Sequence, residues 1–157
     1  MHAFLRRALA SSSDADDLTQ ETFLRLWRAA PRYRPQGRFA AWLFRIAGNL
    51  ARQELRRRKL RALLLGEAQW SLEDVVDSLP APAQFDPESP LRADEIRRAL
   101  AMALAKLPAR QRLAVLLRFY EDMSTAEIAE ALNTSVHAAE SLLARGTRRL
   151  RVLLREP

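Results

Sequence analysis

Hydrophobic residues recur along most of this chain at the three- to four-residue spacing of an α-helix. The spacing predicts one helix from about Asp14 to Ala30 and a second from about Arg38 to Leu60. It predicts two further helices, from Leu91 to Leu107 and from Pro108 to Tyr120. No alternating apolar and polar pattern of useful length predicts a β-strand. The fold class is therefore expected to be all-α.

The first two of these helices each carry an apolar side that we expect to be buried. On the first helix the apolar positions are Leu18, Phe23, Leu26, Trp27 and Ala30. On the second helix they are Phe39, Trp42, Leu43, Ile46, Ala47 and Leu50. Ser13, with Asp16 three residues later, resembles a capping box at the start of the first helix.

The pattern from Ser124 to Arg151 predicts two helices separated by a tight turn. Ser124 and Glu127 form a capping box, and Asn133 tolerates the left-handed conformation that ends a helix. Ser135 can cap the longer helix that follows. That helix has a one-sided apolar stripe made of Val136, Ala139, Leu143, Gly146 and Leu150. Its geometry is that of a helix-turn-helix, with a plain helical hairpin as the alternative.

The side of this longer helix opposite the stripe is polar and rich in arginine. The candidate DNA contacts on it are His137, Ser141, Arg145, Arg148 and Arg149. Arginine can bond guanine through two acceptors at once or neutralise a phosphate. His137 taken alone is better explained as a surface histidine than as a base-reading residue.

The predicted helix from Arg38 to Leu60 also carries a polar stripe opposite its apolar side. This stripe consists of Arg45, Asn49, Arg52, Arg56 and Lys59. A solvated charged face is the alternative explanation, but most such faces mix both signs of charge whereas this one is almost entirely basic.

Charge divides the chain into three blocks. Residues 1–66 carry 14 basic and 5 acidic side chains, residues 67–94 carry 1 and 7, and residues 95–157 carry 11 and 7. The middle block also holds four prolines, which prevent a continuous helix and favour an extended or irregular connection. We therefore expect two small helical domains, 1–66 and 95–157, joined by an acidic linker, 67–94. The net charge of +7 favours a polyanionic partner.

Composition excludes several classes of function. With no cysteine and only His2 and His137, neither a disulfide framework nor a metal site is expected. No nucleophile–base pair or glycine-rich phosphate loop is visible, so we expect neither an enzyme nor a cofactor. The arginines near the N-terminus resemble a secretion signal, but no long apolar stretch follows them. We expect a cytoplasmic protein without membrane insertion of its own.

Several segments, taken in order, resemble the extracytoplasmic-function (ECF) group of bacterial sigma factors. The segment from Asp14 to Trp27, DADDLTQETFLRLW, resembles region 2.2 of that family. By this resemblance Asp17, Gln20 and Glu21 would face the coiled-coil clamp helices of the β′ subunit of core RNA polymerase. The alternative is that they are only the solvated face of a capped helix.

The stretch that begins FAAWLFRIAGN at Phe39 and continues to Lys59 resembles regions 2.3 and 2.4, which open and read the −10 promoter element. A basic groove with aromatic side chains suits a single strand. The −10 candidates are Tyr33, Phe39, Asn49, Arg52, Arg56 and Arg57. The segment from Leu107 to Arg151 resembles region 4, which reads the −35 element as duplex. The acidic linker resembles the segment that threads the RNA exit path, where its charge would mimic RNA.

Some positions depart from the family pattern. Gln53 stands where aspartate is common, and Glu140 and Leu142 stand where basic residues are common, although Ser141 and Arg145 match. Base preference therefore cannot be transferred from the family. Region 2.1 is also expected to be shortened, because family members usually begin with more helix before the equivalent of Phe4.

The resemblance implies a sigma factor that directs core RNA polymerase to promoter DNA, helps to open it, and is held inactive by an anti-sigma factor. Two alternatives belong to other classes. One is a sigma-like decoy that sequesters an anti-sigma factor, and the other is a stand-alone helix-turn-helix regulator. The regulator leaves Asp17, Gln20, Glu21 and the acidic linker unexplained.

Overall fold

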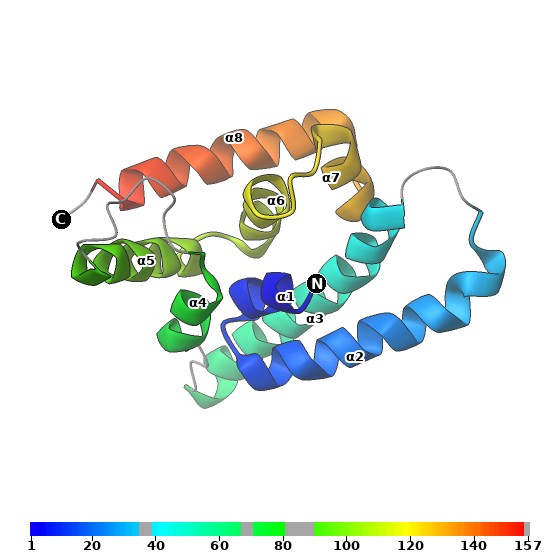
Figure 1. Cartoon of the computed structure of the whole chain (residues 1–157), viewed down its shortest axis with the longest axis horizontal. Helices are drawn as coiled ribbons and strands as arrows, with labels where there is room; N and C mark the ends of the chain where they lie inside the picture. Colours follow the sequence, from blue (N-terminus) through cyan, green and yellow to red (C-terminus); the bar gives the residue numbers. More distant parts are fainter. Residues whose placement is uncertain (35–38, 67–70, 81–89, 156–157) are drawn as a thin grey trace.

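The computed structural model describes residues 1–34, 39–66, 71–80 and 90–155, with the backbone alone at 90–92. All regular secondary structure within these ranges is helical, as the sequence predicts (Figure 1). The elements are α1 (His2–Leu9), α2 (Ser12–Ala29), the 3-10 turn η1 (Ala30–Arg32), α3 (Phe39–Leu65), α4 (Leu72–Ser78), α5 (Pro90–Ala105), α6 (Ala109–Phe119), α7 (Thr125–Ala131) and α8 (Val136–Leu153).

Helix α1 lies at the centre of the molecule and packs against α2, α3, α4 and α6 (Figure 1). Phe4, Leu5 and Leu9 on this short helix are fully buried. The ring of Phe4 meets the ring of Phe44 on α3 edge to face, with 5.1 Å between centroids. Because α1 contacts both halves of the chain, its burial depends on residues distant in sequence.

Helix α2 differs from the prediction at its start and on its apolar side. It begins at Ser12, and the capping side chain is Ser11, whose hydroxyl accepts from the backbone N–H of Asp14, so the expected cap at Ser13 is wrong. Ala15 and Thr22 are buried, whereas Phe23 is 48% and Trp27 81% exposed. The C-terminal end of this helix projects beyond α1 (Figure 1), and part of its apolar side stays uncovered by the residues that the structure describes.

Helix α3 extends to Leu65 instead of ending near Leu60. Its buried face is made of small and aromatic residues, namely Ala41, Phe44, Ala47, Gly48, Leu50 and Ala51. The expected burial of Phe39 is wrong, since its side chain is 48% exposed, and Trp42 is half-buried. The buried face of α3 packs against α1, α2 and α7. These neighbours determine which residues of α3 are buried, and helical periodicity alone does not predict that choice.

The acidic connection between the two halves contains the short helix α4, which the sequence did not predict. Ser71 caps it by accepting from the backbone N–H of Asp74 at 3.2 Å. Asp74 in turn accepts from the N–H and the hydroxyl of Ser12, at 3.1 and 2.8 Å, and lies 3.4 Å from Arg6. This part of the connection is thus fixed to the first half. Pro82 and Pro87 lie outside the described residues.

The second half is built from α5 to α8, with α6 packed along α8. Gly146 permits this close approach, because a Cβ there would lie 2.8 Å from Val115 Cγ2 and 3.3 Å from the carbonyl oxygen of Gln111. Leu113, Leu116 and Leu117 of α6 are fully buried beneath α8 and α7. A larger residue at position 146 would therefore force the two helices apart.

The two halves pack together, and their buried residues form one continuous hydrophobic core. The carbonyl groups at the end of α1 accept hydrogen bonds from three parts of the chain. Arg112 Nη1 of α6 reaches Ala8 at 2.9 Å, Arg58 Nη1 of α3 reaches Leu9 at 2.5 Å, and the N–H of Ser71 reaches Ala10 at 3.0 Å. The division into separate domains at 1–66, 67–94 and 95–157 stays a prediction.

Candidate functional site

Helices α7 and α8 form the helix-turn-helix geometry that the sequence predicts. Ser124 Oγ accepts from the N–H of Glu127 at 3.3 Å, and Glu127 Oε2 accepts from the N–H of Ser124 at 2.9 Å, which completes the capping box. Asn133 adopts a φ of 49° in the turn. Ser135 Oγ then accepts from the N–H of Ala138 at 3.1 Å at the start of α8. The predicted turn and both predicted caps are confirmed.

The outer face of α8 presents the residues predicted for duplex DNA. The side chain of His137 is 91% exposed and lies 3.8 Å from Glu140. Arg145, Arg148 and Arg149 are exposed, and Ser141 is half-buried. Arg145 Nε donates to the Ser141 carbonyl at 3.1 Å, which holds its guanidinium along the helix. Within the predicted apolar stripe, Ala139, Gly146 and Leu150 are buried, whereas Val136 at the start of the helix is 47% exposed.

An aromatic cluster joins the end of η1 to the start of α3. The ring of Tyr33 stacks on Trp42, with 4.3 Å between centroids and 18° between planes. Phe39 meets both rings edge to face at 5.9 Å. Two of the predicted −10 residues, Tyr33 and Phe39, are thus brought together. Trp42, interpreted from sequence as a core residue, belongs to the same cluster.

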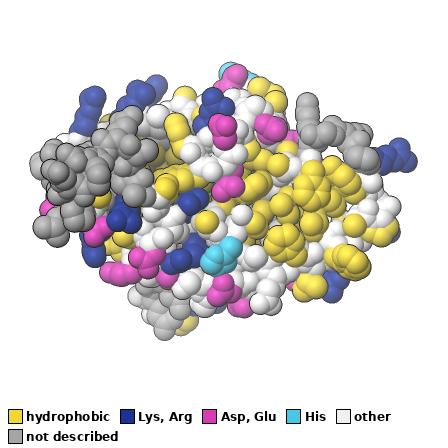
Figure 2. Space-filling view, viewed as in Figure 1, with side chains coloured by type: hydrophobic (Ala, Val, Ile, Leu, Met, Phe, Trp, Pro, Cys, Tyr) yellow, Lys and Arg dark blue, Asp and Glu magenta, His cyan; other side chains and the backbone are white. Residues whose placement is uncertain are grey.

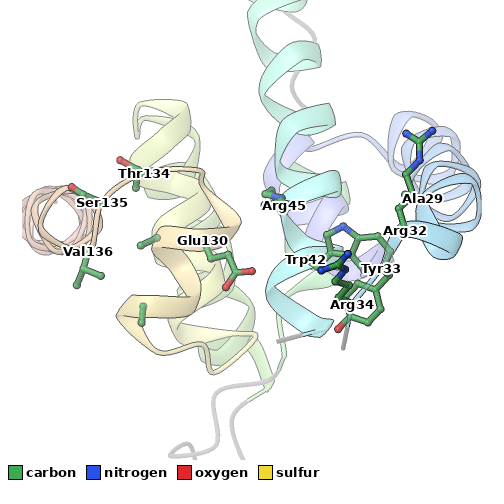
Figure 3. A pocket seen from close by; sticks show the side chains of 12 residues that line it. Ala29, Arg32, Tyr33, Arg34, Trp42, Arg45, Glu130, Thr134, Ser135 and Val136 are labelled. Carbon is green, nitrogen blue, oxygen red and sulfur yellow. The ribbon is translucent and has the colours of Figure 1, made fainter. Parts of the chain in front are cut away.

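A cleft of about 1100 Å³ separates this cluster from the helix-turn-helix (Figure 3). One wall carries Arg32, Arg34 and Arg45 beside the stacked Tyr33 and Trp42. The opposite wall, from α7 and the start of α8, is lined by Ala126, Ala129, Glu130, Thr134, Ser135 and Val136. Glu130 points toward the basic wall (Figure 3). The basic side chains that line this cleft therefore lie on the first wall.

The remaining −10 candidates follow α3 away from the cleft. Asn49 and Arg52 are half-buried, and an Arg52 Nη2 hydrogen donates to Asn49 Oδ1. Burial lowers the pKa of Arg52, and the nearby positive charge of Arg110 on α6 lowers it further. Arg56 and Arg57 are exposed, and Arg57 Nε lies 2.9 Å from Glu54 Oε2. The polar stripe of α3 is therefore exposed to solvent near Arg56 and Arg57 and partly buried at Asn49 and Arg52.

The residues predicted to face the polymerase lie on the outer side of α2. Asp17 and Gln20 are exposed and Glu21 is half-buried. Glu21 Oε1 accepts from Arg25 Nε at 2.6 Å, one turn further along the helix. Helix α2 lies away from α5 and α8 (Figure 1) and packs mainly against α1 and α3.

Sequence reasoning missed several residues that shape these surfaces. Arg32 and Arg34 line the cleft, and their position on both sides of Tyr33 was a signal that could have found them. The buried Arg58 and Arg112 gave no such signal, because their acceptors lie far away in the sequence.

The described residues contain no group of three or more His, Asp or Glu placed to hold a metal ion. None of the described helices could cross a membrane.

Two family models match the chain. Sigma-70 region 2 matches residues 1–61, and Sigma-70 region 4 matches residues 97–150. The ECF RNA polymerase sigma factor SigG of Mycobacterium tuberculosis is 34% identical over 94% of this chain and 44% of that protein. The RNA polymerase sigma factor CarQ of Myxococcus xanthus is 37% identical over 99% of this chain and 83% of that protein. The chain spans about half the length of SigG and most of CarQ.

Solved structures agree with these matches. The sigma factor RpoE in complex with the anti-sigma factor NepR from Bartonella quintana shares the fold, with a TM-score of 0.74 over 99% of this chain and 89% of that chain at 24% identity. CnrH in complex with the cytosolic domain of CnrY has a TM-score of 0.65 over 98% of this chain and 79% of that chain at 27% identity. With region 2 and region 4 both matched in order, the chain belongs to the sigma-70 family of RNA polymerase sigma factors, in its extracytoplasmic-function group.

Proposed function

We propose that this chain is a non-enzymatic promoter-recognition subunit that binds core RNA polymerase and directs it to specific promoters. One observation carries the proposal. The chain holds two different surfaces suited to DNA, an aromatic and basic surface at the start of α3 and a helix-turn-helix on α7 and α8, within the segments matched by regions 2 and 4. A stand-alone regulator needs only the second surface.

The two surfaces suit different forms of DNA. Stacked Tyr33 and Trp42, with Arg45 beside them, offer aromatic faces and positive charge to an unpaired strand of the −10 element. Arg56 and Arg57 continue the positive charge along α3. The exposed arginines of α8 are suited to the major groove of a −35 duplex.

Two protein partners follow from the proposal. Core polymerase would dock on the α2 face through Asp17, Gln20 and Glu21, whose clamp-binding role comes from the family resemblance. An anti-sigma factor is the second partner, which the family resemblance implies; CnrH, on which this chain superposes along its length, was itself solved in complex with the cytosolic domain of CnrY. The proposed activity takes place in the cytoplasm, because that is where core polymerase transcribes the chromosome.

Transcription in vitro tests this proposal. Purified chain is added to core polymerase and a library of promoter fragments, and start sites are mapped by sequencing the RNA. We expect initiation from a subset of promoters, reduced by Arg145→Ala and separately by Tyr33→Ala. Binding of an anti-sigma factor without core binding or initiation would instead indicate a decoy. Operator binding that is unaffected by core polymerase would indicate a stand-alone regulator.

A further inference from the structure

The C-terminal end of α3 carries a group of exposed leucines that the proposed DNA and polymerase contacts do not use. The side chains of Leu60, Leu63, Leu64 and Leu65 are 58%, 74%, 74% and 66% exposed, and these four residues are called the α3 tip below. In Figure 1 the tip lies at the edge of the molecule, on the opposite side from α8. It is separate from the hydrophobic side chains that Figure 2 shows where α2 ends and α3 begins. A group of large apolar side chains left in water indicates a contact with another molecule.

The leucines surround the end of the helix instead of forming one narrow side. Consecutive residues of an α-helix point about 100° apart, so Leu63, Leu64 and Leu65 together cover about 200° of its circumference. The helix ends directly after them, and Gly66 adopts a φ of 70°. A groove in a protein partner would cover one side of this end and leave the rest in water. A fluid apolar phase can surround it.

Basic side chains lie one to two turns before the leucines. Arg56, Arg57 and Lys59 are exposed and Arg61 is half-buried. At 1.5 Å per residue the leucines extend about 6–10 Å beyond these cations along the helix axis. Anionic lipid phosphates lie at the surface of a bilayer, and the acyl chains begin about 5–10 Å below. The order of charge and then apolar surface along α3 therefore matches the order of layers in an anionic bilayer.

Other occupants of the tip use only part of this pattern. A second copy of the chain would cover leucines with leucines, but it would bring two groups of like charges together. A nucleic acid would pair with the cations and leave the leucines in water. An anionic bilayer satisfies both, because its phosphates accept from the cations and its acyl chains cover the leucines on every side.

We propose that the α3 tip docks this chain on the surface of an anionic phospholipid bilayer. The leucines lie at the boundary between headgroups and acyl chains, and Arg56, Arg57, Lys59 and Arg61 contact lipid phosphates. The contact stays at the surface of the bilayer and needs no helix that crosses it. This inference goes beyond the proposed function and adds a membrane surface to its partners.

One consequence links the membrane to DNA. Arg56 and Arg57 are also candidates for contact with the −10 strand, so lipid phosphates and that strand compete for the same two guanidinium groups. Bilayer-bound chain would therefore bind a −10 oligonucleotide more weakly than free chain. The leucines take no part in the DNA contact, so they separate the two activities.

Vesicle flotation tests the proposal with the full chain. Vesicles of phosphatidylglycerol and phosphatidylcholine are compared with vesicles of phosphatidylcholine alone. The variant carries Leu63→Gln and Leu64→Gln together, because glutamine keeps helix propensity while it removes apolar surface. Met102→Gln is the control, since Met102 on α5 is also apolar and 49% exposed. Circular dichroism of each chain confirms that it folds.

We expect wild-type chain to bind the anionic vesicles, less tightly as salt is added, and not the neutral ones. The double leucine variant should bind them about tenfold more weakly or worse, from the loss of buried apolar area, and Met102→Gln should match wild type. Affinity for a −10 oligonucleotide should be the same in wild type and in the double leucine variant.

A fluorescent label locates the contact on the chain. The sequence has no cysteine, so Leu65→Cys carries an environment-sensitive dye at the tip and Ser13→Cys carries it at an exposed position of α2. Anionic vesicles should shift the emission of the dye at position 65 to the blue and leave the dye at position 13 unchanged. Equal shifts at both positions would contradict docking by the tip.

Three further outcomes would overturn the proposal. Wild-type chain that stays free of anionic vesicles would do so, and so would equal vesicle binding by wild type and the double leucine variant, because cations alone would then suffice. A dimer of wild-type chain that the leucine variant abolishes, with no vesicle binding, would assign the tip to a second copy. Core polymerase binding lost in that variant, again with no vesicle binding, would assign the tip to a protein.

Discussion

Arg112 of α6 donates a hydrogen bond from Nη1 to the carbonyl oxygen of Ala8 in α1, across 2.9 Å. Its Nη2 donates to the carbonyl oxygens of Ala105 and Leu107, at 2.9 and 3.1 Å. Burial lowers the pKa of Arg112 to about 10, with the charge of Arg58 as the second cause. The group stays charged at neutral pH, and its hydrogen bonds to three carbonyls offset part of the cost of burying that charge.

Replacing Arg112 should therefore destabilise the whole chain. Arg112→Leu leaves three carbonyl groups without their donor, and we expect a loss of about 3–5 kcal/mol in the free energy of unfolding. Urea denaturation followed by circular dichroism measures it. Arg118→Ala is the matched control, because Arg118 is exposed and makes one bond to the Met123 carbonyl at 3.0 Å. Equal effects of the two substitutions would contradict a structural role for the buried arginine.

Asp74 should make the attachment of α4 to region 2 sensitive to acid. Partial burial by itself raises the pKa of Asp74, but hydrogen bonds involving Ser12 and Ser71 and the charge of Arg6 outweigh it, so the pKa is lowered. A carboxyl group with a lowered folded-state pKa contributes stability that is present above its unfolded pKa and is lost as the pH falls through its folded pKa.

The test compares wild-type chain with Asp74→Asn across pH. We expect wild-type chain to be the more stable at neutral pH and the difference to disappear in acid, below the ordinary pKa of aspartate. Thermal unfolding at several pH values measures it, and Asp77→Asn serves as control because Asp77 is exposed and only 3.9 Å from Arg6 at its nearest. A pH-independent difference would show that the carboxylate charge is not what matters.

Asn133 should tolerate glycine better than alanine. Its φ of 49° lies in the left-handed region, where a Cβ costs about 1–2 kcal/mol and glycine has no such penalty. We expect Asn133→Ala to lower stability by about 1 kcal/mol and Asn133→Gly to leave it nearly unchanged. Binding to a −35 duplex should follow the same order, because the turn sets the angle of α8 to α7. A greater loss with glycine than with alanine would contradict this account.

Arg145 and Arg149 should affect duplex binding in different ways if one reads bases and the other contacts phosphate. Arg145 lies in the middle of the exposed face of α8, and we expect Arg145→Ala to cost about 1–3 kcal/mol on the preferred −35 sequence and to reduce discrimination against other sequences. Arg149→Ala should weaken binding to all sequences alike and lower its salt dependence. Fluorescence anisotropy at several salt concentrations distinguishes the two, and unchanged affinity for Arg145→Ala would remove it from the interface.

The sequence alone was enough to predict the parts of the structure that depend on interactions between residues close together in the chain. The capping box of Ser124 and Glu127, the left-handed Asn133 and the cap at Ser135 each involve residues within a few positions of one another, so local chemistry determined them. The helical spans follow from a periodicity that is also local. The order of the matched segments likewise follows from the chain itself, which is why the family could be recognised without a structure.

Only the tertiary structure decided which apolar faces are covered and which arginines are buried. Periodicity places Phe39 and Trp27 on the apolar sides of their helices. Both residues lie where α2 ends and α3 begins, outside the hydrophobic core, and their side chains stay exposed. Arg112 could not be distinguished from the exposed arginines, because its acceptor on Ala8 lies 104 residues away. The partial burial of Asn49 and Arg52 likewise arises only in the folded chain, where other helices pack against α3. Burial is a property of the assembled chain, and the segment that covers a side chain is seldom next to it in sequence.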